Sequence, residues 1–295
     1  MWNSLTMVDA IKKVEIDVPA VVEPIKAQRR FGIIVIGDEI LSGRRQDKHL
    51  ATLIDLLNER GLSLAWAKYV ADDPEQITAT LKASFASGDV VFSTGGIGAT
   101  PDDHTRQCAA LALGTKTELH PSAQELIAGR IQSMAEGDPI KADLNTPENQ
   151  QRFKMGEFPI GSEIIPNPYN QIPGFRIQEH HFVPGFPVMA APMMAWCLDT
   201  YYQDLFHQEN RVEQSFIVPM GIESTLTPLM ERIEASYPGV KVFSLPSVGD
   251  ATKGGVYAQR HIELGIKGNA NLLESAWIAL RAGTQDLGYE IHDIS

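Results

Sequence analysis

Apolar runs and helical spacings alternate along the first two thirds of the chain. Phe31–Ile36 is a continuous apolar run, which is typical of a strand that is covered on both faces, and Leu64–Val70 and Asp89–Ser93 are predicted to be the next two strands. Apolar residues at helical spacing follow each run, and the predicted helices cover Leu50–Leu57, Pro74–Phe85 and Arg106–Leu113. Alternation of strand and helix with short loops predicts an α/β fold, a mostly parallel sheet with helices in layers on both faces.

The pattern is less regular beyond these units. A helix is predicted over 121–136, and the polar stretch Gly137–Gln151 is predicted to be a mobile loop near the site. Short strand candidates broken by Pro and Gly follow, at Glu163–Ile165, Gly174–Ile177 and His181–Val183. A helix is predicted to start after Pro184-Gly185-Phe186-Pro187, because two prolines around a glycine make a rigid turn.

The last part of the chain shows a different order of predicted strands and helices. Strands are predicted at Val212–Pro219, Val240–Leu245 and Val256–Ile266, with helices around Leu226–Ile233 and Leu272–Ala282. This order suits a second, smaller, two-layer α/β domain. We therefore divide the chain into an N-terminal extension over 1–30, a large domain over 31–208 and a small domain over 209–295.

Composition restricts the class of function. The net charge of −12 and the pI near 5.1 argue against a nucleic-acid surface, which needs clustered Lys and Arg. No run of 18 apolar residues occurs, so no membrane span is expected, and the charged first 30 residues do not make a secretory signal. Cys108 and Cys197, the only two cysteines, lie among apolar neighbours and are expected to be core thiols. We expect a cytoplasmic protein.

The most specific stretch runs from Thr94 to Thr105, directly after the third predicted strand. Gly95, Gly96 and Gly98 leave main-chain N–H groups uncovered, and the helix that follows adds its positive end, so an anion can approach the chain closely. The adjacent carboxylates Asp102 and Asp103 would repel a phosphate unless a divalent cation lies between them. The stretch predicts a phosphate-and-metal site, although a Gly-rich turn before a well-capped helix also occurs without any ligand.

Two other loops lie at the same edge of the predicted sheet. In parallel sheets ligands bind outside the carboxyl ends of the strands. The loops Asp38–Gly43 and Asp72-Asp73 follow the first two predicted strands, as Gly95–Asp103 follows the third. We expect the three loop tips to converge on one small molecule.

The motifs resemble those of a known family. Thr94-Gly95-Gly96-Ile97-Gly98 with Pro101–Thr105, Gly37–Gly43, Val70–Asp73 and Pro184–Pro187 match, in order, the molybdopterin-binding family, and in particular the N-terminal part of the competence/damage-inducible protein A (CinA) family. The resemblance covers roughly 31–205 strongly and 212–293 more loosely. In the longest members a deamidase domain follows, and since this sequence ends at Ser295 we expect that activity to be missing.

The resemblance implies a ligand and a set of roles. Members bind molybdopterin or nucleotides, and some relatives hydrolyse the pyrophosphate bond of ADP-ribose or a similar dinucleotide with a divalent metal such as Mg²⁺. Asp72 and Asp103 match the functional acidic positions, and Asp102 with Asp103 would hold the metal. The residues expected to hold the ligand or its phosphates are Gly37, Asp38, Ser42, Gly43, Thr94, Gly95, Gly96, Gly98, Lys154, Pro184 and Gly185. Relatives form dimers or trimers, so a homo-oligomer is expected.

Several alternatives remain open. Ala99 stands where many relatives carry Pro, which would loosen the glycine loop. Lys154, with Arg152, could belong to a solvated helix face instead of clamping phosphates. His180 and His181 suggest a metal, but with no third ligand nearby a pair at a strand edge is the favoured interpretation. The protein could be a pyrophosphatase, a molybdopterin-binding module without turnover, or a scaffold that has lost catalysis.

Overall fold

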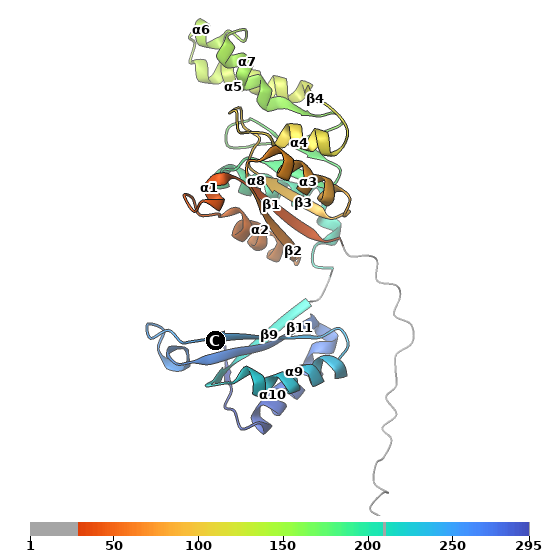
Figure 1. Cartoon of the computed structure of the whole chain (residues 1–295), viewed down its shortest axis with the longest axis vertical. Coiled ribbons are helices and arrows are strands. Elements are labelled where there is room, and N and C mark those ends of the chain that lie inside the picture. The colour runs from red at the N-terminus through yellow and green to blue at the C-terminus, as the bar shows by residue number, and fades with distance from the viewer. Residues whose placement is uncertain (1–28, 209–210, 295) are drawn as a thin grey trace, which may run out of the picture.

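The computed structural model describes residues 29–208 and 211–294 (Figure 1). The predicted extension over 1–30 therefore lies outside the described residues except for Arg29 and Arg30. None of the described helices is long and apolar enough to cross a membrane.

A six-stranded sheet forms the centre of the larger part, in the order β2-β1-β3-β8-β7-β6. The strands are β1 (Phe31–Ile36), β2 (Leu64–Val70), β3 (Val90–Thr94), β6 (Glu163–Ile165), β7 (Gly174–Ile177) and β8 (His180–Val183). β2, β1, β3 and β8 pair in parallel, whereas β7 is antiparallel to both of its neighbours. The prediction of a mostly parallel sheet is confirmed.

Helices cover both faces of this sheet, which gives three layers (Figure 1). One face packs against α2 (His49–Asn58) and α8 (Pro187–Tyr201), with Leu53 and Met193 in the core. The other face packs against α3 (Pro74–Phe85), α4 (Thr105–Ala112) and the start of α5 (Pro121–Ala135). Because both faces are covered, every residue of β1 is buried, as its continuous apolar sequence predicts.

The polar stretch over 137–151 is not a loop, so that prediction is wrong. It contains α6 (Pro139–Ala142) and most of α7 (Pro147–Phe153), each with Pro in its first turn. The side chains of Asp138 and Thr146 accept hydrogen bonds from main-chain N–H groups at the two helix starts. These N–H groups have no acceptor within the helix, so the two side chains supply one. The remaining short elements of this part are α1 (Asp38–Leu41), β4 (Thr117–Leu119), η1 (Lys154–Gly156), β5 (Glu157–Pro159) and η2 (Gln203–Leu205).

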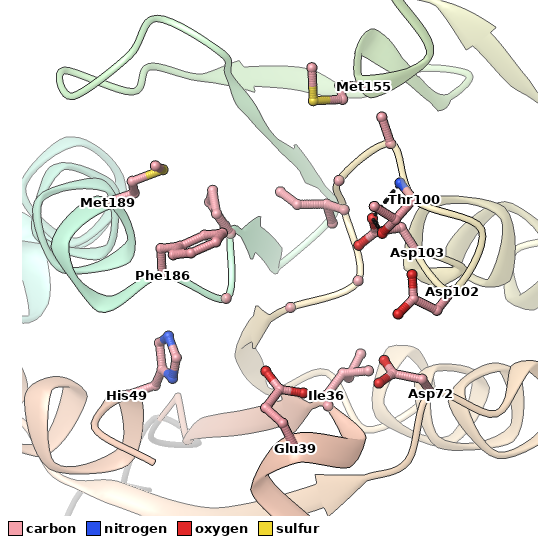
Figure 2. Close-up of a pocket in the computed structure, with 18 of the residues that line it drawn as sticks. Ile36, Glu39, His49, Asp72, Thr100, Asp102, Asp103, Met155, Phe186 and Met189 are labelled. Carbon is pink, nitrogen blue, oxygen red and sulfur yellow. Dashed lines mark hydrogen bonds between the residues drawn. The ribbon is translucent and has the colours of Figure 1, made fainter. Parts of the chain in front are cut away.

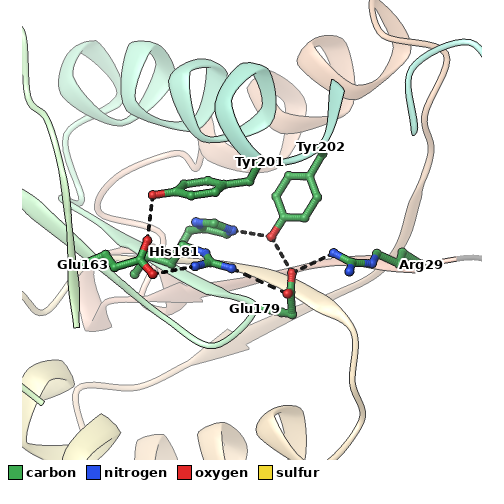
Figure 3. Close-up of polar contacts among 7 residues, drawn as sticks. Arg29, Glu163, Glu179, His181, Tyr201 and Tyr202 are labelled. Carbon is green, nitrogen blue, oxygen red and sulfur yellow. Dashed lines mark hydrogen bonds and ion pairs between the residues drawn. The ribbon is translucent and has the colours of Figure 1, made fainter. Parts of the chain in front are cut away.

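The histidine pair lies in the middle of the sheet and not at an edge, which corrects the prediction for it. β8 is flanked by β3 and β7, and both His180 and His181 are buried. His180 hydrogen-bonds Ser84, and His181 hydrogen-bonds Tyr202, whose hydroxyl donates to Glu179 (Figure 3). The pair is therefore part of the core.

The smaller part has a separate sheet and its own core. β9 (Arg211–Pro219), β10 (Lys241–Ser247), β11 (His261–Asn269) and β12 (His292–Asp293) form an antiparallel sheet in the order β10-β11-β9-β12. The helices α9 (Glu223–Ser236) and α10 (Ala270–Asp286) pack on it around Leu226, Leu264 and Leu280. The strand predicted from Val256 begins only at His261, because the 3-10 turn η3 (Gly255–Ala258) precedes it.

Candidate functional site

A cavity of about 370 Å³ lies at the carboxyl ends of β1, β3 and β8 (Figure 2). Residues from all three predicted loops line it, together with the Pro184–Phe186 turn after β8, His49 of α2 and Met189 of α8. The volume is in the range that small-molecule sites occupy. Of the predicted site residues, those that line the cavity are Gly37, Asp72, Gly95, Gly96, Gly98, Asp102, Asp103, Pro184 and Gly185.

The glycine loop can be built only without side chains. A Cβ on Gly95 would lie 2.2 Å from the main-chain oxygen of Ile36, and one on Gly96 would lie 2.1 Å from Oγ1 of Thr105. Both residues also have a positive φ, 94° and 67°, which L side chains rarely adopt. The N–H of Gly95 donates to the oxygen of Val183 at 3.2 Å, whereas the N–H groups of Gly96, Ile97 and Gly98 have no acceptor in the described parts of the chain.

The start of α4 holds the opposite side of this loop. Oγ1 of Thr105 donates to the oxygen of Gly95 at 3.0 Å, and the N–H of Thr105 donates to the oxygen of Gly96 at 3.0 Å. The buried Arg106 donates from Nη1 to the oxygen of Ile97 at 2.8 Å. Because α4 engages these carbonyl groups, the loop conformation is fixed and its N–H groups remain for an anion.

The carboxylates gather on one side of the cavity (Figure 2). Oδ2 of Asp72 accepts the N–H of Asp38 at 2.8 Å, and Oδ1 of Asp38 accepts the N–H of Asp72 at 3.2 Å, so the first two loop tips are joined. Burial raises the pKa of Asp72, and the negative charges of Asp38, Glu39 and Asp102 raise it further against the hydrogen bond from Asp38. This side of the cavity therefore gathers several negative charges around Asp72.

Asp103 has a structural task within the loop. Its Oδ2 accepts the N–H of Thr100 at 2.8 Å and also the Thr100 hydroxyl, which closes a turn around Pro101. Gly98 is required beside it, since a Cβ there would lie 2.5 Å from Oδ2 of Asp103. The metal and catalytic roles predicted for Asp103 stay predictions, and one of its two oxygens already has partners.

The donor set suits a metal that shares its ligands with phosphate and water. Within residues 29–208 and 211–294, no three His, Cys, Asp or Glu side chains are grouped closely enough to hold an ion by themselves. Asp72 and Asp102 both line the cavity, and their carboxylates lie near each other on the same side of it (Figure 2). Mg²⁺ commonly uses one or two carboxylates and completes its shell with phosphate oxygens and water, so this pair fits such a site.

Five predicted ligand residues do not line the cavity. Thr94 is buried at the end of β3, while Asp38, Ser42, Gly43 and Lys154 are exposed. Asp38 still acts on the site through its hydrogen bonds with Asp72. The contacts predicted for the other four stay predictions.

The turn after β8 packs directly on the glycine loop. A Cβ on Gly185 would lie 3.3 Å from Cα of Gly95, so the two loops approach with little room between them. This approach follows from the sheet, because Thr94 of β3 pairs with Val183 of β8. The predicted Pro184–Pro187 turn therefore forms one wall of the cavity.

The site prediction left out a second group of lining residues. Glu39 and Phe186 belong to the predicted motifs but were given no role of their own, and the residues outside those motifs are Arg45, His49, Met155, Asn167, Asn170 and Met189. Arg45 and His49 follow the Gly37–Gly43 motif directly, and the spacing of Asp47 before His49 at a helix start was the available signal. Met155, Asn167, Asn170 and Met189 lie far away in sequence and join the site only through the order of the strands.

Comparisons with known proteins identify a family for the larger part of the chain. A family model described as "Probable molybdopterin binding domain" matches residues 32–203. A CinA-like protein from Anaeromyxobacter dehalogenans is 34% identical over 160 residues, which are 53% of this chain and 37% of that protein. A protein from Aeropyrum pernix is 28% identical over 275 residues, covering 90% of this chain and 97% of its own length.

Solved structures are also similar. The crystal structure of CinA from Thermoplasma acidophilum, titled as a protein of unknown function, covers 58% of this chain and 98% of its own, at 24% identity and a TM-score of 0.49. The chain spans little more than a third of the length of the first CinA-like relatives that it matches in sequence.

Proposed function

We propose that this chain, which belongs to the probable molybdopterin binding domain family, binds a phosphorylated nucleotide or pterin in the cavity at the ends of β1, β3 and β8. The observation that carries the proposal is the set of three N–H groups at Gly96, Ile97 and Gly98, which have no acceptor in the described ranges and border the cavity. Phosphate oxygens would accept these hydrogen bonds, and the positive end of α4 would add to the attraction.

A divalent cation, Mg²⁺ by preference, would occupy the space between this phosphate and the carboxylates of Asp72 and Asp102. The clustered charges that raise the pKa of Asp72, after burial itself, support a cation there. When bound, the ion would neutralise phosphate charge and orient water. The chain's own groups would hold the phosphate at the glycine loop and keep the carboxylates in place through the paired hydrogen bonds of Asp38 and Asp72.

The reaction that we propose is hydrolysis of a dinucleotide such as ADP-ribose or FAD. Water would add across the P–O–P bond, which breaks to give two monophosphates, one of them AMP. Non-catalytic binding of molybdopterin in cofactor biosynthesis is the alternative. It is favoured by the description of the matching family, a probable molybdopterin binding domain. We also propose that the protein forms a dimer or trimer in solution. Size-exclusion chromatography with light scattering measures the molar mass of that assembly.

The test is AMP release from ADP-ribose and FAD with and without Mg²⁺. We expect Asp72→Asn and Asp102→Asn each to lower the rate at least about tenfold, because each removes a negative ligand from the proposed cation. Asp55→Asn is the matched control, since Asp55 is an exposed carboxylate on α2 outside the cavity. If the wild type binds these ligands but releases no AMP, the non-catalytic alternative replaces the hydrolase. An unchanged rate in both variants would refute the carboxylate assignment.

A further inference from the structure

We infer that His49 is the ring-recognition residue of this cavity and that its Nε2 accepts a hydrogen bond from an N–H on the edge of a planar nitrogen heterocycle. The inference rests on the proposed function and assigns the second end of the same ligand. The His49 side chain is 5% exposed and lines the cavity from the start of α2. Its Nε2 has no hydrogen-bond partner in the described part of the molecule and is covered by its neighbours in this conformation, so a ring N–H reaches it once a side chain of the cavity wall has shifted.

The other ring nitrogen is fixed by Asp47. Nδ1 of His49 lies 2.9 Å from Oδ1 of Asp47, and the same oxygen accepts the main-chain N–H of His49 at 2.8 Å. Oδ2 accepts the N–H of Leu50 at 3.2 Å and the hydroxyl of Tyr69 at 2.8 Å. Burial raises the pKa of Asp47, but these four hydrogen bonds together hold it below its usual value of 3.8. Asp47 is therefore an ionised carboxylate near neutral pH.

This anchor determines which nitrogen carries the proton. An ionised carboxylate only accepts hydrogen bonds, so Nδ1 of His49 must be the donor. A second proton on Nε2 would have no acceptor in the described ranges. With Nδ1 engaged as the donor, Nε2 is the ring nitrogen left to accept a hydrogen bond, and a buried acceptor is costly to leave without a donor.

The surroundings of His49 differ from the charged side of the cavity. Figure 2 shows the imidazole on the side of Phe186 and Met189, away from Asp72, Asp102 and Asp103. Phe186 is 54% exposed although it is a large aromatic side chain, so one face of its ring is free to stack. Apolar side chains beside one buried acceptor are the usual composition of a site for a flat heterocycle.

The two ends of the cavity together describe the ligand class. The N–H groups at Gly96–Gly98 suit a phosphate, and the His49 end suits an aromatic ring with an N–H donor. The amino group of adenine and the amino group of a pterin both supply that donor. The shared chemistry is thus a phosphorylated heterocycle that carries an amino group. Binding assays with adenine and pterin compounds distinguish which of the two rings the cavity binds.

The experiment compares ligand pairs that differ only in this amino group. Calorimetry with AMP and with purine riboside monophosphate tests the nucleotide, and 6-hydroxymethylpterin phosphate with its 2-desamino analogue tests the pterin. We expect the wild type to prefer the amino form of one pair by about tenfold, the value of one hydrogen bond. His49→Asn should abolish the preference, because the shorter amide can still donate to Asp47 but places no acceptor at the Nε2 position. His292→Asn, in the smaller part of the chain, is the matched control.

Two results would overturn the inference. If His49→Asn binds with the wild-type preference, His49 does not read the ring, while the phosphate site of the proposed function stands. If neither amino ligand binds the wild type, the proposed function fails together with the inference. A second measurement needs no ligand: nitrogen NMR of the labelled imidazole should show Nε2 without a proton at neutral pH and a change in its shift when the amino ligand is added. A protonated Nε2 contradicts the inference.

Discussion

Two clusters in the large domain each contain a histidine, a tyrosine and a carboxylate, yet they differ in their surroundings. In the first, Tyr69 donates to Asp47, which anchors His49 at the cavity. In the second, Tyr202 donates to Glu179 and accepts from His181, inside the core under α8 (Figure 3). Each histidine keeps one nitrogen without a partner among the described residues, Nε2 in His49 and Nδ1 in His181.

The comparison teaches that an unpaired imidazole nitrogen is not by itself a sign of a site. His181 is fully buried, stacks on Phe92 at a centroid distance of 5.0 Å and borders no cavity that the structure describes. Only His49 combines the unpaired nitrogen with a cavity wall and an exposed aromatic neighbour, Phe186. We therefore expect substitutions in the second cluster to change stability, and those in the first to change binding.

The largest expected effect separates the two tyrosines. Tyr202 is 0% exposed and packs edge-on against Phe31, so Tyr202→Ala should lower the free energy of unfolding by about 3–5 kcal/mol through the cavity that it leaves. Tyr69 is 42% exposed, and Tyr69→Ala should cost less than about 1.5 kcal/mol, mostly one hydrogen bond. Urea unfolding measures both. Equal losses would mean that the two clusters are equally structural.

Acid should separate the clusters by pH window. Burial is the main cause that lowers the pKa of His181 in the folded protein well below 6.5. At a pH below 6.5 but above this lowered pKa, only the unfolded chain binds the proton. The free energy of unfolding therefore falls as the pH falls from about 6.5. His181→Gln should remove about 1.4 kcal/mol per pH unit from this slope. Asp47 has a pKa below 3.8, so its contribution is present above that pH and is lost only as the pH falls further.

The matched variant for this window is Asp47→Asn. Its unfolding free energy should follow the wild-type slope between pH 6.5 and 4.5 and diverge only below about pH 4. Urea titrations at half-unit steps measure the slopes. If the unfolding free energy of His181→Gln depended on pH as steeply as that of the wild type, His181 would be charged in the folded protein, contrary to the effect of its burial.

The smallest effect concerns the two hydroxyl groups alone. Tyr202→Phe leaves His181 without its hydrogen-bond partner in the core and removes one of the contacts of Glu179, which keeps Arg29 and Arg176, and should cost about 1–3 kcal/mol. Tyr69→Phe leaves Asp47 with three other hydrogen bonds and should cost less than about 1 kcal/mol. Thermal unfolding of the pair checks the order, and a larger loss in Tyr69→Phe would reverse the comparison.

Much of the large domain could be predicted because its central strands β1 and β3 are buried on both faces. The continuous apolar run of β1 and the predicted strand Leu64–Val70 agree with the observed bounds of β1 and β2, and the Asp73-Pro74 start of α3 has the predicted cap, with Asp73 accepting from Gln76. The glycine loop could also be predicted from local sequence, because its backbone conformation and close contacts require glycine at these positions.

The rest depends on contacts between distant segments. His180 and His181 are not at an edge because β7 pairs beyond them, and nothing local indicates that partner. Arg45 and His49 line the cavity only because Phe186 and Met189 close it from α8. The short helices α6 and α7 were missed because capping by Asp138 and Thr146, and not an apolar face, defines their starts.

The tight approach of Gly185 to Gly95 has a consequence for how the protein matures. Since β8 inserts beside β3, the walls of the cavity cannot meet until nearly two hundred residues have left the ribosome and paired. Such late, long-range pairing is slow. Ligand binding during refolding would therefore report the rate of this late strand pairing, which follows the formation of the helices.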